Sequence, residues 1–156
     1  MYNTSAIFKP FYDTSILINI GNTTTSVAID ANYASSHMFF NIPTGLENII
    51  KSIKAFINTS YRDIKRALNH KESIDFSLQS LIKAQFSLLF LKIKDYIAPV
   101  LTNSNKTKIK IFGCDFEGLV PLCLQNFSNH STELYISVIT PIFHQMNMES
   151  LGIHNS

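Results

Sequence analysis

The sequence contains little of what most catalytic or metal-binding sites require. Only two cysteines occur among 156 residues, Cys114 and Cys123, and they form neither a C-x-x-C pair nor a zinc-like spacing. The five histidines are dispersed, and no two have the i, i+4 spacing of a metal site on a helix. The G-x-S-x-G motif of serine hydrolases is also absent. These absences argue against a zinc site, a disulfide framework and serine-hydrolase chemistry.

Charge is also scarce. Charged residues make up 15% of the chain and the formal net charge is +2, with the basic residues in short groups such as Lys106, Lys108 and Lys110. Aromatic residues are not interleaved with these groups, as they are in single-strand nucleic-acid binders. Hydrophobic residues reach 46%, which excludes a disordered chain. We therefore expect a folded domain and no nucleic-acid partner.

Long apolar runs are missing. No stretch approaches the roughly 18 uninterrupted apolar residues of a membrane span, because Lys83, Lys92 and Asp95 interrupt the most apolar region. Residues 1–15 lack the basic start and apolar core of a signal peptide. With so few cysteines, the sequence predicts a reduced cytoplasmic protein, located in the cytoplasm or at the cytoplasmic side of the inner membrane.

Short apolar runs predict three strands near the start of the chain, at residues 15–20, 26–30 and 37–42. The first two are separated by "GNTTT" and the last two by "ANYASS". Each separation is short enough for a hairpin connection. The sequence therefore predicts a three-stranded antiparallel meander.

Helical spacing follows. Apolar residues recur at this spacing from Leu46 to Ile57, and Ser60 is placed to cap a short helix that ends at about Asn69. A long helix is expected from about residue 74 to 98, and Pro99 is expected to end it. Its predicted apolar face is formed by Leu78, Leu81, Ile82, Leu88, Leu89 and Ile93, and is widened by Phe76, Phe86, Phe90 and Tyr96.

Near the end of the chain, lysine and apolar residues alternate as in a half-buried strand. "KTKIKIFG" predicts a strand that passes through Gly113 into a helix from about Gly118 to Phe127, and "ELYISVI" predicts a further strand. "TPIFHQMNM" is expected to begin one more helical turn. The whole chain, residues 1–156, is predicted to be one α/β domain, with a core at about 14–150 and an extension at 1–13.

This order of elements resembles the second half of an actin-like ATPase of the actin, sugar-kinase and Hsp70 class, whose lobes are ribonuclease H-like. "INIGNTTTSVAID" resembles the D-x-G-x-x-x-T phosphate loop of that class, and residues 108–127 resemble its adenosine-binding strand, glycine and helix. The resemblance implies a fold that binds ATP and Mg. It places Gly21, Asn22, Thr23 and Thr24 at the phosphates, Lys65 and Gly113 at the adenosine, and Asn19 near the metal.

Four positions depart from the pattern. Asn19 stands where the class has an acidic residue, and an amide cannot supply that charge. Side chains at Ile111 and Phe112 precede Gly113 where the class has glycines. Arg62 stands where a glutamate is expected three residues before Lys65. We therefore expect binding of ATP and Mg to be weak or lost, and we expect no catalytic residues.

Within the class, "MFFNIPTGLENIIKSIKAFIN" and "YRDIKRALN" resemble the elements that follow the phosphate loop in PilM and FtsA proteins. That resemblance implies a non-catalytic cytoplasmic scaffold of a type IV pilus or related membrane machine. Its partner would be the cytoplasmic tail of a membrane protein, or a complementary actin-like lobe.

Other interpretations stay open. An FtsA-like cell-division role is one, and a small-molecule kinase of the type III pantothenate kinase kind is another, since its "DIGNT" resembles "NIGNT" here. The chain could also be one lobe of a split ATPase. Residues 21–25 could form an ordinary β-turn with exposed hydroxyls, and Cys114 could be a small buried residue without chemistry.

Overall fold

The computed structural model describes residues 13–31, 36–69, 74–128 and 132–139. In chain order these form β1 (Asp13–Ile20), β2 (Thr25–Ala31), β3 (Ser36–Ile42), α2 (Leu46–Lys54), α3 (Tyr61–Asn69), α4 (Phe76–Asn103), β4 (Lys106–Phe112), α5 (Leu119–Phe127) and β5 (Glu133–Val138). The predicted order of strands and helices is confirmed. The predicted helical turn after β5 lies outside the described residues.

The five strands form one mixed sheet in the order β3-β2-β1-β4-β5. β1 pairs with β2 and β2 with β3 in antiparallel fashion, which confirms the predicted meander. β4 is parallel to both β1 and β5. β1, β4 and β5 therefore all end at the same edge of the sheet, which we call the carboxyl edge.

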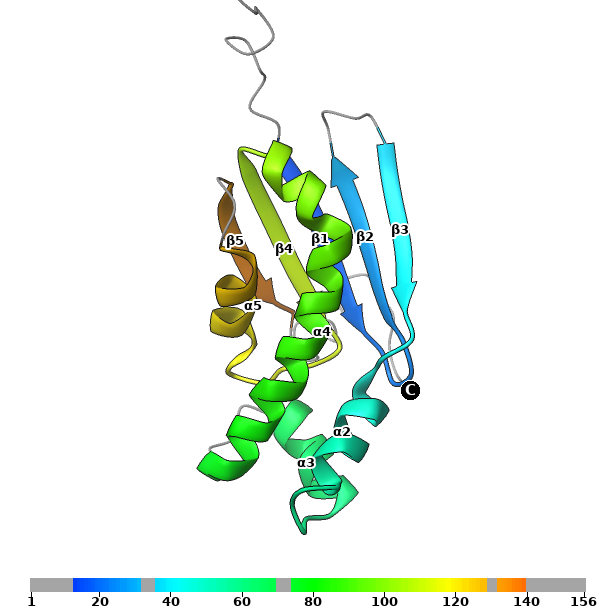
Figure 1. Cartoon of the computed structure of the whole chain (residues 1–156), viewed down its shortest axis with the longest axis vertical. Helices are drawn as coiled ribbons and strands as arrows, with labels where there is room; N and C mark the ends of the chain where they lie inside the picture. The colour runs from blue at the N-terminus through cyan, green and yellow to red at the C-terminus, as the bar shows by residue number, and fades with distance from the viewer. Residues whose placement is uncertain (1–12, 32–35, 70–73, 129–131, 140–156) are drawn as a thin grey trace, which may run out of the picture.

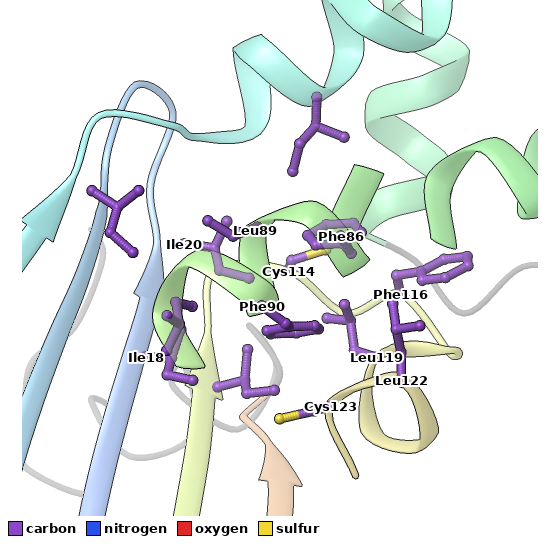
Figure 2. Packing of buried hydrophobic residues seen from close by; sticks show 14 of the residues in the cluster. Ile18, Ile20, Phe86, Leu89, Phe90, Cys114, Phe116, Leu119, Leu122 and Cys123 are labelled. Carbon is purple, nitrogen blue, oxygen red and sulfur yellow. The ribbon is translucent and has the colours of Figure 1, made fainter. Parts of the chain in front are cut away.

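Buried and exposed residues alternate strictly along β1 and β4, so the sheet has one buried and one exposed face. Ile16, Ile18 and Ile20 of β1, with Ile109 and Ile111 of β4, are buried beneath α4 and α5 (Figure 1). Figure 2 shows aromatic rings of α4 in this core, near α5 and the end of β1. The intervening side chains, which include Leu17, Asn19, Lys108 and Lys110, are exposed on the opposite face.

α2 and α3 lie beyond the carboxyl edge (Figure 1). α2 is amphipathic, and its buried residues are Leu46, Ile49, Ile50 and Ile53. At the start of α3 the Ser60 hydroxyl accepts a hydrogen bond from the backbone N–H of Asp63 at 3.0 Å, which confirms the predicted cap.

The prediction that Pro99 ends the long helix is wrong, because α4 continues through Pro99 to Asn103. A proline inside a helix costs about 3 kcal/mol. Val100 and Leu101 in the next turn are both buried, and burying such side chains contributes about 1.5–3 kcal/mol each. Burial in the core therefore offsets the proline, and the Asn103 amide adds a hydrogen bond to the carbonyl oxygen of Pro99 at 2.8 Å.

The predicted apolar face of this helix is wrong at three positions. Phe76, Leu88 and Tyr96 are 79%, 56% and 57% exposed, whereas Leu89 and Phe90 are buried. The continuous apolar run from Leu88 to Leu91 hides which residues face the core, since periodicity needs polar positions to define it. No helix among the described residues is both long enough and apolar enough to cross a membrane.

Candidate functional site

The β1–β2 turn, Gly21–Thr24, lies at the carboxyl edge. The Gly21 N–H donates a hydrogen bond to the Thr24 carbonyl oxygen at 2.9 Å and closes the turn. The side chains of Asn22, Thr23 and Thr24 are exposed. No hydrogen bond within the described part of the chain engages the backbone N–H groups of these three residues. The turn thus presents three unengaged backbone donors, two hydroxyls and an amide.

The start of α2 fixes the orientation of this turn. The N–H groups of Leu46 and Glu47 donate hydrogen bonds to the carbonyl oxygens of Gly21 and Asn22, each at 2.9 Å. These donors are two of the four that a helix N-terminus leaves without helical partners. The N–H of a trans peptide unit points opposite to its C=O. The N–H groups of Asn22 and Thr23 therefore point away from α2, where an anion could approach them.

Gly45 permits this close approach between turn and helix. A Cβ atom at Gly45 would lie 2.5 Å from the carbonyl oxygens of both Gly21 and Asn22. One residue earlier, the carbonyl oxygen of Thr44 accepts a hydrogen bond from the Thr25 hydroxyl at 2.7 Å. Thr25 is buried and its hydroxyl is engaged, so it belongs to the support of the turn.

Gly113 lies beside the β1–β2 turn. Its φ of +91° is in the left-handed region that favours glycine. A Cβ atom there would collide with the carbonyl oxygen of Ile20, the residue before Gly21. The structure therefore brings the predicted phosphate-binding and adenosine-binding glycines together at the carboxyl edge, where ligands bind in open sheets with parallel strands.

Asn19 also lies where the β1–β2 turn meets Gly113. It is exposed near the end of β1 and paired in register with Phe112. Its side-chain oxygen is 3.4 Å from where a Cβ atom of Gly113 would be. An amide offers a neutral acceptor and two donors but no negative charge. Among the described residues, no group of three or more histidine, cysteine or acidic side chains is placed to hold a metal ion.

Lys65 lies on α3 and is exposed. It lines a surface hollow of about 390 Å³ with Tyr61, Arg62, Arg66 and Asn69, all from the same helix. No residue of the loop after Gly113 lines this hollow. The hollow carries three cationic side chains.

The loop after Gly113 packs against the end of α3. The Leu68 carbonyl oxygen accepts hydrogen bonds from the Asp115 N–H at 2.8 Å and from the Cys114 thiol at 3.1 Å. Burial raises the pKa of Cys114 to about 12, and that of Cys123 likewise. Both thiols therefore stay protonated near neutral pH. The interpretation of Cys114 as a small buried residue agrees with this environment.

Sequence reasoning missed Asp115, the buried carboxyl group of this loop. It is only 8% exposed, and its Oδ1 atom has no hydrogen-bond partner among the described residues. A buried acceptor without a partner costs about 1–3 kcal/mol, so it marks a place where a donor is expected. The signal in the sequence was an acidic residue two positions after the strand-ending Gly113.

No family model and no curated protein matches the sequence. Solved structures do match. Ta0583, an archaeal actin homologue, aligns with a TM-score of 0.57 and 13% identity over 85% of this chain and 43% of its own. The apo ParM protein of pSK41 aligns with a TM-score of 0.51 and 15% identity over 88% of this chain and 40% of its own.

The ethanolamine utilization protein EutJ from Carboxydothermus hydrogenoformans aligns with a TM-score of 0.50 and 16% identity, over 82% of this chain and 45% of its own. The chain thus spans less than half the length of each of these structures. The chain has the fold of a single lobe of an actin-like protein.

Proposed function

We propose that this chain is a non-hydrolysing actin-like scaffold that keeps a phosphate-binding turn and acts by binding another protein. The observation that carries the proposal is the amide of Asn19 at the junction of the β1–β2 turn and Gly113. Hydrolysis in this setting needs an anion to hold a metal ion and to order water around the phosphates. Asn19 supplies none.

The turn itself fits a phosphate group. The backbone N–H groups of Asn22 and Thr23 point away from α2, and the hydroxyls of Thr23 and Thr24 are exposed beside them. Such convergent donors bind phosphate oxygens. A bound ATP would be held at its phosphates by this turn. Mg does not fit equally well, because Asn19 is neutral and Asp115 is buried.

Isothermal calorimetry with ATP and Mg tests the turn. We expect weak binding, at about millimolar affinity or about −4 kcal/mol, that Thr24→Ala reduces severalfold. Thr102→Ala, which changes an exposed threonine at the end of α4, is the matched control and should bind as the wild type does. Equal binding by wild type and Thr24→Ala would contradict a phosphate role for the turn.

A hydrolysis assay tests the absence of catalysis. The wild type and Thr24→Ala should release phosphate at the same rate. In the binding assay, Asn19→Asp, which restores a carboxylate, should tighten Mg-dependent nucleotide binding. Release by the wild type that Thr24→Ala abolishes would refute the scaffold proposal and favour an ATPase or a small-molecule kinase.

The partner we propose, by resemblance to PilM, is the cytoplasmic tail of a membrane protein in a pilus or related assembly machine. Immobilised tail peptides should retain the purified chain. Failure to bind any such peptide, together with failure to bind a related actin-like subunit, would remove the support for a scaffold.

A second candidate follows from the coverage of the solved structures. Because the chain spans less than half of each, it could be one lobe that a separate actin-like polypeptide completes. A stable complex with such a polypeptide that raises ATP affinity at least about tenfold, or 1.4 kcal/mol, would favour this candidate over the scaffold.

A further inference from the structure

β5 is an outer strand of the sheet, and within the described residues it pairs on one side only, with β4. The N–H of Glu133 donates to the carbonyl oxygen of Asn105, directly before β4, and the N–H of Ile139 donates to that of Ile111 in β4, each at 2.8 Å. Backbone groups of alternate residues point to opposite sides of a strand. The N–H and C=O groups of Leu134, Ile136 and Val138 therefore point outward, away from β4.

A hollow of about 440 Å³ follows this outer edge. On the side of α5 it is lined by apolar side chains, those of Val120 and Leu124 from the helix and of Leu134 and Ile136 from the strand. Leu124 is 45% exposed. The other residues that line the hollow are Lys108, Lys110, Tyr135 and Ser137. The apolar side of this hollow, beside unpaired strand groups, has the form of a site that receives another strand.

Within the described residues, β5 itself also lacks the lysine, proline or bulge that usually protects an edge strand. Natural edges carry lysine, proline or a bulge that prevents pairing with another chain. The sequence of β5 is ELYISV, and its only charged residue is Glu133 at the start. At the other outer strand, β3, the ring of Phe40 stacks on that of Tyr96 of α4, with the ring centroids 4.4 Å apart.

We propose that two copies of this chain pair through β5 in antiparallel orientation, with Tyr135 on the two-fold axis. In this register Leu134 lies opposite Ile136 of the second copy, so the outward backbone groups of each residue meet those of the other. Both side chains point to the α5 side and fill the hollow beside Leu124. The two sheets become one, with the helices of both copies on the same face.

Charge complementarity selects this register over its neighbours. Lys110 of β4 pairs with Ser137 of β5, and Ser137 would lie opposite Glu133 of the second copy. Two strand spacings, about 9.6 Å, separate the backbones of Lys110 and that glutamate. The small Ser137 between them lets the ammonium and the carboxylate meet. Because the dimer is two-fold symmetric, it contains two such ion pairs.

A shift of the pairing by two residues would place Glu133 opposite Tyr135, whose ring would then stand between the carboxylate and Lys108, or opposite Ile139, away from both lysines. A shift by one residue would place α5 of the second copy on the opposite face and leave the hollow unfilled. An isologous contact of this kind closes as a dimer and does not grow into a filament. The dimer does not depend on nucleotide binding, so its test is independent of the proposed function.

Sedimentation of the full chain across a concentration series tests association. We expect a species of twice the 17.6 kDa chain mass, and Leu124→Lys should weaken the association at least about tenfold. Leu91→Lys is the matched control, since Leu91 is 48% exposed on α4, away from this hollow. A wild type that stays monomeric, or equal association of both variants, would overturn the proposal.

Cross-linking tests the register. Opposed residues on the axis of an antiparallel pair have Cα atoms about 4.5–5.5 Å apart, within the disulfide range. Tyr135→Cys should therefore form a disulfide-linked dimer on mild oxidation, while both native cysteines stay buried. Phe39→Cys, exposed on β3, is the control. No cross-link through residue 135, or an equal yield through residue 39, would overturn the register.

Discussion

Replacing Gly45 by alanine should separate the β1–β2 turn from α2. The new Cβ atom would lie 2.5 Å from the carbonyl oxygens of Gly21 and Asn22, so the backbones must move apart by about 1 Å to reach ordinary contact. The two hydrogen bonds to these oxygens, each 2.9 Å long, would then exceed hydrogen-bond length. Each contributes about 1 kcal/mol, and alanine is a poorer helix N-cap than glycine by about 1 kcal/mol.

Alanine also lowers the entropy of the unfolded chain, which returns about 0.4–1 kcal/mol. Because the φ of Gly45 is −137°, an extended value that alanine adopts, no backbone strain is added. The expected net loss is about 2–3 kcal/mol, seen in urea as a midpoint lowered by about 1–1.5 M for a slope of about 2 kcal/mol per M.

Gly118→Ala is the control for this experiment. The nearest atoms to a Cβ at Gly118 are side-chain atoms of Phe116 and Lys83, at 2.8 Å and 3.0 Å, which can shift where backbone cannot. Its loss should be less than half that of Gly45→Ala. A loss below about 0.5 kcal/mol for Gly45→Ala would show that the helix start does not hold the turn.

Three further outcomes are expected. Leu89→Lys should lower the free energy of unfolding by about 3 kcal/mol or more, while Leu88→Lys changes it by less than about 0.5 kcal/mol, in urea titrations. Pro99→Ala should raise the melting temperature, because it restores a backbone donor inside α4. Burial raises the pKa of Cys114 and Cys123 from 9.0 to about 12. The free energy of unfolding should therefore be unaffected by these thiols below about pH 9 and should fall as the pH rises towards 12. Cys123→Ala should show a smaller decline between those pH values.

Each of these outcomes has a result that would contradict it. Equal losses at positions 88 and 89 would mean that the buried face of α4 is misplaced. A lower melting temperature for Pro99→Ala would mean that the rigidity of proline in the unfolded chain outweighs the missing donor. An unchanged pH dependence in Cys123→Ala would assign the alkaline decline to other groups.

The strands of this fold could be predicted because their residues alternate. In β1 and β4 every second residue is apolar, and those residues are the buried ones, so burial and sequence carry the same period. The glycines at the carboxyl edge were also predictable as turns. Their neighbours in space were not predictable, because the packing of Gly113 against Ile20 joins segments that lie far apart in the sequence.

Contacts between distant segments account for what the sequence could not predict. α4 passes Pro99 because Val100 and Leu101 are buried in the core, and burial is a property of the assembled core. Two features distinguish Asp115: its N–H donates a hydrogen bond to the carbonyl oxygen of Leu68, and its Oδ1 has no partner among the described residues. Neither feature leaves a pattern in the neighbouring sequence. Lys65 matched a motif by spacing alone, and the structure places it in a hollow formed by α3 itself.

The geometry of the β1–β2 turn also separates residues that serve the fold from residues that do not. A Cβ at Gly21 would lie 2.8 Å from the Thr24 carbonyl oxygen, and one at Gly45 would press on the turn, so folding alone requires both glycines. Their presence is therefore no sign of a ligand. Asn22, Thr23 and Thr24 are exposed and make no hydrogen bond through their side chains within the described residues. Folding does not require these three side chains, so a phosphate-binding role must be tested on them, and Thr24→Ala is the substitution that separates function from stability.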